Sequence, residues 1–264
     1  FSLVTGVQTC ALPIYNFEGV GLSGSAIVID HVTLVKGTKT KKAGLLGANN
    51  TNNPFAGCSA GFVATITNCT IEEGVIVGYD GNESNIGGFA GRMQGTVENC
   101  VNHGTVKGKN YVGGIVGSRD NAMGACVIKD CTFDGIVTAT GEQVGGIIGG
   151  AYVNSSAPNG VRVAVTGNEA SGRVTGKNYV GGIMGADYYV NQNWGSGSFK
   201  LNKFSGKVEA TDGDYVGGVI GYLASLNKYD NVTGNYYASD CGAEKGIGFV
   251  KYVDTSCKTH ETES

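Results

Sequence analysis

Apolar and polar residues alternate over short stretches of this chain, and glycine-containing turns separate the stretches. One stretch consists of a glycine, a variable residue and a valine, and it recurs at residues 104–106, 135–137, 172–174 and 206–208. Another lies in the segments VENC, VIKDC and FKLN, upstream of Val101, Thr132 and Lys203. Alternation rich in Val, Ile and Thr is typical of short β-strands. Because helical periodicity is absent, the pattern predicts an all-β protein.

A six-residue phrase provides a third strand in each repeat. It consists of an apolar residue, two glycines, two apolar residues and a glycine: IGGFAG (86–91), VGGIVG (112–117), VGGIIG (144–149), VGGIMG (180–185) and VGGVIG (216–221), with a degenerate KAGLLG at 42–47. The first glycines of the five phrases are 26, 32, 36 and 36 residues apart. Such periods indicate stacked supersecondary units. Three short strands per repeat predict a parallel β-solenoid of about seven to eight glycine-rich coils, about 4.8 Å apart.

The phrase raises a structural question, because its two adjacent apolar residues cannot both face inward on a regular strand. Either their outer face is covered, or the glycine pair bends the strand at a corner of the coil. The turns GKNY (108–111 and 176–179) and DGDY (212–215) precede three of the phrases. The glycines expected to shape the repeat are Gly87, Gly88, Gly91, Gly113, Gly114, Gly117, Gly145, Gly146, Gly149, Gly181, Gly182, Gly185, Gly217, Gly218 and Gly221.

The composition agrees with a turn-rich β-protein. Glycine contributes 46 of 264 residues, and the hydrophobic content of 41% is enough for a core. The formal net charge of -3 offers no basic field for nucleic acid. No apolar run approaches the length of a transmembrane helix, so no membrane span is expected.

The ends of the chain differ from the repeats. Residues 4–14 (VTGVQTCALPI) resemble a translated sequencing adapter, and we interpret residues 1–14 as an adapter-derived artefact; a genuine N-terminal strand is the alternative. The solenoid is predicted over residues 15–250. Residues 251–264 are interpreted as a polar C-terminal tail or a truncated continuation. We therefore expect the chain to be a fragment.

Cysteines follow the repeat. Cys69, Cys100 and Cys131 are 31 residues apart, which predicts a buried, reduced ladder one coil apart. A disulfide between neighbouring rungs is also compatible with that distance. Cys241 and Cys257 are the better candidates for a disulfide. No CxxC pair or nearby histidine completes a metal-ligand set, so no metal site is expected.

At the repeated phrase the chain resembles the GLUG-motif family of bacterial surface proteins, through GFAG, GIVG, GIIG, GIMG and GVIG. NCVNHGTVKG and KDCTFDGIVTATG are similar to the family's linking segments, and the resemblance covers about residues 40–250. It implies a right-handed parallel β-solenoid (β-helix) in an exported, secreted or wall-attached protein. Family members include adhesin-like proteins and non-catalytic regions of immunoglobulin A-cleaving metallopeptidases. The copy containing Gly44 departs from the pattern, since alanine replaces its first glycine.

Catalytic motifs are incomplete. A zinc protease requires HExxH, but Ser264 occupies the second ligand position after His260 and Glu261. His103 lies in a turn, where a structural role is favoured. Acidic residues are scattered among turns instead of forming a carboxylate pair. GVGLSG at 19–24 precedes a strand-like segment, whereas a dinucleotide site would open a helix. We expect no catalytic residue, no cofactor and no enzymatic activity.

Variable loops are the predicted binding region. From the strand glycine to the next phrase the separations are 9, 10, 9 and 11 residues, but from the phrase to the next strand glycine they are 13, 18, 23 and 21. Insertions therefore gather on one side, where solenoids often bind partners. The candidate ligand-binding residues are Tyr152, Tyr188, Tyr189, Trp194 and Tyr222. Coverage of the solenoid by these aromatic side chains is the alternative.

These observations lead to two functional hypotheses. The first is a non-enzymatic module of an exported bacterial surface protein, which adheres to a host glycan or protein or acts as a spacer. The second is an accessory solenoid of a larger secreted protease or glycoside-active enzyme whose catalytic domain lies outside this sequence. An extracellular or cell-wall location is implied by the family resemblance.

Overall fold

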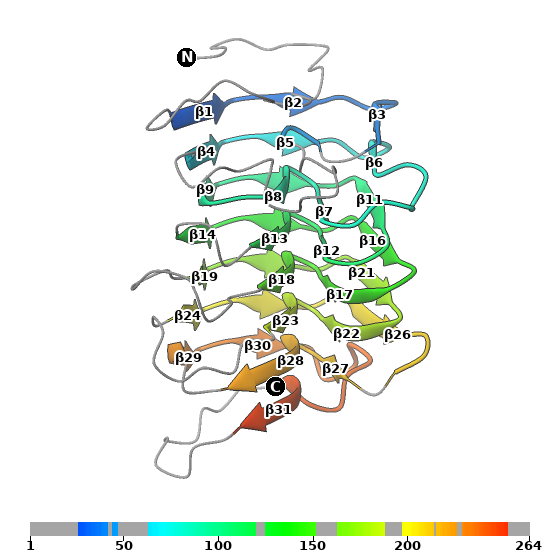
Figure 1. The fold of residues 1–264 in the computed structure, drawn as a ribbon, viewed down its shortest axis with the longest axis vertical. Coiled ribbons are helices and arrows are strands. Elements are labelled where there is room, and N and C mark those ends of the chain that lie inside the picture. Colours follow the sequence, from blue (N-terminus) through cyan, green and yellow to red (C-terminus); the bar gives the residue numbers. More distant parts are fainter. Residues whose placement is uncertain are drawn as a thin grey trace.

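The computed structural model describes residues 26–41, 44–46, 63–119, 125–151, 163–187, 197–213, 215–225 and 229–252. Over these residues the chain is a parallel β-solenoid whose coils stack from the N-terminal end at the top of Figure 1 to the C-terminal end at the bottom. The described residues form strands and turns, with no helix among them. The predicted all-β class and parallel solenoid architecture are confirmed.

The expectation of three strands per coil is wrong, because a complete coil passes through five sheets. We number these sheets one to five in chain order. The first sheet has seven strands: β1 (Ala26–Asp30), β4 (Val63–Thr67), β9 (Gly95–Glu98), β14 (Cys126–Lys129), β19 (Val163–Thr166), β24 (Gly197–Lys200) and β29 (Tyr229–Thr233). The second also has seven: β2 (Thr33–Leu34), β5 (Thr70–Ile71), β10 (Val101–Asn102), β15 (Thr132–Phe133), β20 (Glu169–Ala170), β25 (Lys203–Phe204) and β30 (Tyr236–Tyr237).

The remaining three sheets contain the glycine-x-valine stretches and the glycine phrases. The third sheet has six strands: β3 (Lys39–Thr40), β6 (Ile76–Val77), β11 (Thr105–Gly108), β16 (Ile136–Ala139), β21 (Arg173–Gly176) and β26 (Lys207–Ala210). The fourth has five: β7 (Ile86–Gly87), β12 (Val112–Gly113), β17 (Glu142–Gly145), β22 (Asn178–Gly181) and β27 (Val216–Gly217). The fifth has six: β8 (Ala90–Arg92), β13 (Val116–Arg119), β18 (Ile148–Ala151), β23 (Met184–Asp187), β28 (Ile220–Ser225) and β31 (Ile247–Tyr252).

In-register parallel pairing places equivalent residues of successive coils in columns. In the first sheet Ile66 pairs with Val97, and Val97 with Ile128, and all three are fully buried. Each such side chain contributes about 1.5–3 kcal/mol by leaving water. The core is therefore a set of apolar columns that run the length of the solenoid.

The glycine phrase bends the chain back on itself at a corner of the coil. In VGGIVG, Val112 and Gly113 belong to β12, and β13 begins at Val116, so the bend falls between them. Ile115 and Val116, the adjacent apolar pair, are both fully buried. A Cβ on Gly113 would lie closer than 3.0 Å to backbone atoms of the returning strand, including the nitrogen of Gly149 in the next coil. Bending therefore explains why both apolar residues are buried. The first glycine lets the strands on the two sides of the bend approach each other.

The second glycine of the phrase makes room for a side chain from the second sheet. A Cβ on Gly114 would lie 2.6 Å from the ring of Phe133, and a Cβ on Gly182 would overlap the ring of Phe204. In the first complete phrase the opposing residue is Asn102, which is buried and donates to the carbonyl oxygen of Gly114 at 2.6 Å. The second glycine is thus required because its Cβ would meet the carbonyl oxygen of the equivalent glycine in the next coil, in the first four phrases, and a core side chain as well in most of them.

Length variation is concentrated between the fifth sheet of one coil and the first sheet of the next. The connecting segments there are residues 47–62, 93–94, 120–125, 152–162, 188–196 and 226–228. The connection between the third and fourth sheets also varies once, since residues 78–85 form a longer turn between β6 and β7. The insertions thus lie in the connection from the glycine phrase to the next coil, as the sequence spacing predicted.

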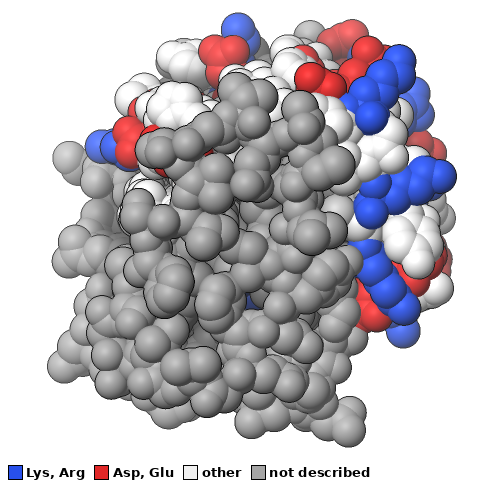
Figure 2. Space-filling view, turned by 90° about the horizontal axis from the view of Figure 1, so that it is seen from above, with Lys and Arg blue, Asp and Glu red and all other residues white. Residues whose placement is uncertain are grey.

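Charged side chains are mixed on the surface. In the view of Figure 2, lysine, arginine, aspartate and glutamate side chains are interspersed along one flank of the described residues. Some pair between neighbouring strands, as in Glu98 and Lys129, whose Oε1 and Nζ atoms are 2.6 Å apart. Among the described residues there is no helix that could cross a membrane.

Candidate binding surface

Tyr222 is the one predicted ligand-binding residue that lies within the described part of the chain. Tyr152, Tyr188, Tyr189 and Trp194 lie outside the described residues. Tyr222 lies on β28 and is only 8% exposed, because neighbouring aromatic rings surround it. By itself, Tyr222 offers little surface to a partner.

Four rings form an aromatic patch on the C-terminal coils, made of Tyr179, Tyr215, Tyr222 and Phe249. The rings of Tyr179 and Tyr215 stack with centroids 5.1 Å apart and planes at 2°. Tyr222 meets both of them edge-on, at 5.2 and 5.8 Å. Phe249 stacks on Tyr222 at 5.6 Å and leans against Tyr215 at 4.9 Å. Each ring thereby restricts the movement of the others.

Strand register assembles this patch from residues that are far apart in the sequence. Tyr222 pairs with Ala186 of the preceding coil and with Phe249 of the next. In earlier coils the same column contains Ser118 and Gly150, which pair with each other. The column also contains Arg92 one coil earlier, so small residues in the middle coils separate that arginine from the aromatic C-terminal end.

The second column of the patch comes from the turn residue before each glycine phrase. Tyr179 and Tyr215 occupy this position in consecutive coils, directly before Val180 and Val216, which pair in register. The backbone of Tyr179 is left-handed, with φ of 52°. Sequence reasoning placed both tyrosines in turns but did not identify them as ligand-binding candidates. Their shared position, together with Tyr222, is the signal that could have predicted the stack.

The patch combines an apolar body with polar edges. Tyr179 and Tyr215 are half-buried, and Phe249 is 39% exposed, so part of the patch is accessible to a partner. Aromatic rings with hydroxyl groups suit partners that have both apolar and hydrogen-bonding surface. The mutual packing of the rings also means that little side-chain entropy remains to be lost on binding.

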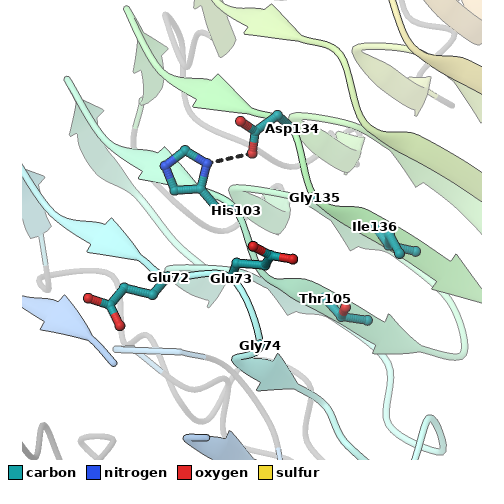
Figure 3. A pocket seen from close by; sticks show the side chains of 8 residues that line it. All are labelled: Glu72, Glu73, Gly74, His103, Thr105, Asp134, Gly135 and Ile136. Atoms are coloured by element: carbon teal, nitrogen blue, oxygen red, sulfur yellow. Dashed lines mark hydrogen bonds and ion pairs between the residues drawn. The ribbon is translucent and has the colours of Figure 1, made fainter. Parts of the chain in front are cut away.

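A separate hollow with a volume of about 680 Å³ lies over the second and third sheets in the N-terminal half. It is lined by Glu72, Glu73, Gly74, His103, Thr105, Asp134, Gly135 and Ile136 (Figure 3). His103 Nδ1 and Asp134 Oδ1 are 2.6 Å apart and link two coils, and Glu72 accepts a hydrogen bond from the backbone N–H of Lys36. The His103 and Asp134 side chains are each 42% exposed, so their pairing contributes at most about 1 kcal/mol. These contacts support the structural role expected for His103.

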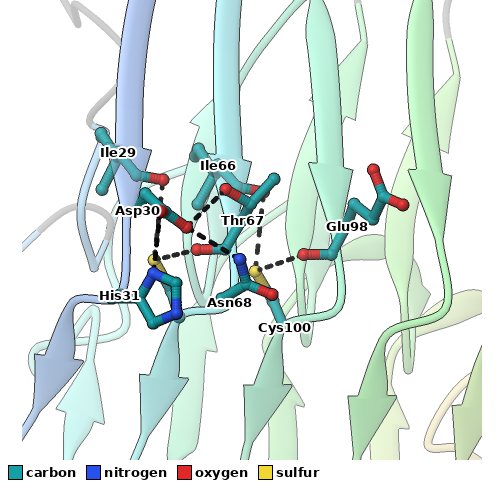
Figure 4. Close-up of polar contacts among 9 residues, drawn as sticks. Ile29, Asp30, His31, Ile66, Thr67, Asn68, Glu98 and Cys100 are labelled. Carbon is teal, nitrogen blue, oxygen red and sulfur yellow. Dashed lines mark hydrogen bonds and ion pairs between the residues drawn. The ribbon is translucent and has the colours of Figure 1, made fainter. Parts of the chain in front are cut away.

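The predicted cysteine ladder is present at the corner between the first and second sheets. Cys69, Cys100 and Cys131 are buried, free thiols. Each donates to a carbonyl oxygen of the preceding coil, as Cys100 does to Ile66 at 3.7 Å (Figure 4). The pKa of Cys100 is raised to about 12, first by its hydrogen-bonding contact with Cys131 and also by burial. The pKa of Cys69 is raised as well, first by its contact with Cys100. Cys69 and Cys100 are therefore poor nucleophiles.

Asparagines continue this column in the C-terminal coils, which the sequence reasoning missed. We call the whole column the corner ladder: Cys69, Cys100, Cys131, Asn168, Asn202 and Asn235. Asn202 Nδ2 donates to the carbonyl oxygen of Val165 and to Oδ1 of Asn235, both at 2.9 Å. Cys241, for which a disulfide with Cys257 was considered, is a buried free thiol; Cys257 lies outside the described residues.

Metal-binding geometry is not found in the described residues. No group of three or more His, Cys, Asp or Glu side chains there is arranged to hold an ion. The described histidines, His31 and His103, each lie beside one aspartate, Asp30 and Asp134.

Comparison with known proteins identifies one partial relative. No family model and no solved structure matches the chain. Halomucin from Haloquadratum walsbyi (strain DSM 16790 / HBSQ001) is 34% identical over 118 residues, which is 41% of this chain. The chain spans only about 1% of the length of halomucin.

Proposed function

We propose that this chain is a non-enzymatic adhesion module of an exported surface protein and that the aromatic patch is its binding surface. The observation that carries the proposal is the mutual packing of Tyr179, Tyr215, Tyr222 and Phe249 on a solenoid scaffold, with Phe249 exposed. The expected partner is a glycan or a protein on a host surface. A rigid stack of hydrogen-bonded coils also suits a spacer, and the two roles are compatible.

The proposed function goes together with a specific architecture and cellular location. We infer a right-handed solenoid of seven to eight coils of the GLUG-motif kind, supported by the iterated phrase and by the seven strands in each of the first two sheets. An extracellular or cell-wall location is supported by the similarity to halomucin, whose name refers to mucins. The absence of catalytic activity is likewise an inference, based on the incomplete motifs.

Adhesion of the labelled protein to host epithelial cells tests the proposal. Tyr215 contacts all three other rings, so Tyr215→Ala is expected to reduce cell binding about tenfold or more. Tyr79→Ala is the matched control, because Tyr79 is 50% exposed and lies outside the patch. Circular dichroism and thermal unfolding show whether each variant is folded. Equal binding by a folded Tyr215→Ala variant would exclude the patch as the adhesive surface.

A further inference from the structure

The aromatic patch ends at Phe249 on the C-terminal coil. Phe249 lies on β31, the last strand of the fifth sheet, and contacts Tyr215 and Tyr222 of preceding strands. No other described ring packs on Phe249. Its exposure of 39% contrasts with 8% for Tyr222, its partner in the same column. Phe249 is therefore the member of the patch with the most accessible ring surface.

The charge of the patch indicates what could occupy that surface. All four rings are uncharged and contact one another, and Tyr179 and Tyr222 take part in further interactions. Lys251, two residues further along β31, takes part in an interaction of its own. A nucleic acid or a strongly charged peptide would gain little from a neutral surface on a chain with a formal net charge of -3. Charge complementarity thus favours an uncharged partner.

The chemistry of the rings narrows the class further. A sugar ring has an apolar C–H face bordered by hydroxyl groups, which matches the exposed phenyl face of Phe249 beside the half-buried Tyr215. We propose, building on the adhesion function above, that Phe249 is the stacking platform for one sugar ring of an uncharged polysaccharide. The sugar would continue the aromatic stack by one further ring. The Tyr215 hydroxyl would hydrogen-bond to the sugar at its edge.

Affinity gel electrophoresis with soluble polysaccharides tests this assignment. The probes are xyloglucan, galactomannan and mixed-linkage β-glucan, with hyaluronan as the acidic comparison. The intact chain is expected to be retarded by at least one uncharged polysaccharide and not by hyaluronan. Phe249→Ala is expected to weaken that binding about tenfold, and Phe249→Tyr to leave it within about twofold, since it keeps the aromatic face.

Two further variants separate stacking from stability. Phe249→Leu retains apolar bulk without an aromatic face, so a folded Leu variant is expected to lose binding as the Ala variant does. Tyr236→Ala is the matched control, because Tyr236 is 45% exposed and lies outside the patch. Unchanged polysaccharide binding by a folded Phe249→Ala or Phe249→Leu variant overturns the proposal. Failure of the intact chain to bind any of the three uncharged probes overturns it as well.

Failure of this inference is distinguishable from failure of the adhesion function. If cell binding depends on Tyr215 and is abolished by protease treatment of the cells, with no uncharged polysaccharide bound, the adhesion function stands and its ligand is a protein. If neither cells nor polysaccharides bind, both proposals fall. Sensitivity of cell binding to glycosidase treatment, together with loss in Phe249→Leu, supports both.

Discussion

The corner ladder is built from thiols in the N-terminal coils and from amides in the C-terminal coils. Both kinds of side chain occupy the same slot and donate to the same backbone position of the preceding coil. The Cys131 thiol reaches the carbonyl oxygen of Val97 at 3.7 Å, whereas the Asn202 amide reaches that of Val165 at 2.9 Å. The shorter bond from a stronger donor indicates a firmer connection between the C-terminal coils.

Amides also join neighbouring rungs through stronger hydrogen bonds than thiols form. Oδ1 of Asn202 accepts hydrogen bonds from the backbone N–H and the side-chain Nδ2 of Asn168, at 3.1 and 3.0 Å. The asparagines are consequently joined to one another as well as to the backbone. The geometry of the coil therefore fixes the slot, and the chemistry of the side chain sets how strongly successive coils are joined.

The residue that precedes each rung of the corner ladder also differs between the two halves. It has a left-handed backbone throughout, and in the thiol half it is Asn68, Asn99 or Asp130. In the amide half it is Gly167, Leu201 or Gly234. Asparagine, aspartate and glycine tolerate this conformation, whereas leucine does so at a cost.

Removing an amide from the middle of the ladder is expected to have the largest effect. Asn202→Ala removes the side-chain hydrogen bonds to Asn168 and Asn235 and leaves the buried backbone N–H of Asn168 without its acceptor, so it should lower the free energy of unfolding by about 3 kcal/mol. Urea denaturation measures the change. The matched substitution in the thiol half, Cys100→Ala, is expected to cost only about 1 kcal/mol, because a thiol is a weak donor to the carbonyl oxygens of Ile66, at 3.7 Å, and Glu98, at 3.3 Å. Equal losses would mean that the two halves are joined equally strongly.

Extending the amide series by one coil is expected to stabilise the protein. In Cys131→Asn, the new Nδ2 should donate to the carbonyl oxygen of Val97 and to Oδ1 of Asn168, by analogy with Asn202. We expect a gain of about 1 kcal/mol in the free energy of unfolding, measured by urea denaturation. Cys131→Ser, which is shorter and has no amide, serves as the control and should not stabilise. A destabilised Asn variant would show that the thiol half is too tightly packed for the amide.

Relieving the left-handed leucine is expected to give a smaller gain. Leu201 has φ of 58° and is 61% exposed, so its side chain contributes little burial against the backbone cost. Leu201→Asn should raise the free energy of unfolding by about 0.5–1 kcal/mol, since asparagine occupies the same position at Asn68 and Asn99. Thermal unfolding monitored by circular dichroism provides the measurement. Lys200→Asn, one residue earlier in strand β24, should not stabilise.

The thiol half has a pH-dependent contact at its N-terminal end. Oδ1 of Asp30 accepts hydrogen bonds from Asn68 at 2.9 Å and Thr67 at 2.7 Å (Figure 4). These bonds, with that of Asn68 foremost, lower the pKa of Asp30 from 3.8 to about 2. A carboxylate with a lowered pKa stabilises the folded state above pH 3.8, and the contribution is lost as the pH falls towards 2.

Asp30→Asn tests this contact. The difference in urea midpoint between the wild-type chain and the variant is expected to shrink between pH 5 and pH 2.5, because protonated Asp30 and asparagine have the same charge. Since the group is exposed to solvent, the effect should be the smallest of the four. A difference that stays constant over this range would contradict the role of the charged carboxylate.

Periodicity predicted much of the fold because the spacing of repeated residues can be read directly from the sequence. The spacing of Cys69, Cys100 and Cys131 predicted a buried ladder of free thiols, and the structure confirms it. The asparagine rungs were missed because asparagine is common in turns, and because nothing in the local sequence distinguishes a buried Asn202 from an exposed Asn99. The extra two-residue strands of the second sheet were missed because they are too short to show alternation.

The candidate site was predicted only in part, for a related reason. Tyr222 was identified from its place near the variable arc, but its partners Tyr179, Tyr215 and Phe249 lie on other coils. Ring contacts depend on which residues share a column, and unequal coil lengths conceal the columns in the sequence. Tyr179 and Tyr215 share a position before the glycine phrase, whereas Phe249 has no phrase beside it to reveal its register.

The sequence by itself determined that this is a glycine-punctuated parallel β-solenoid, because repeated spacing, alternation and glycine pairs are local features that each coil carries. Only the tertiary structure decided that the glycine phrase bends at a corner. The bend depends on backbone segments of the same and the next coil that come together where Gly113 has no Cβ. The tertiary structure also decided that thiols and amides form one corner ladder and that four rings form a patch. Those contacts join residues about one coil apart, and strand register sets them.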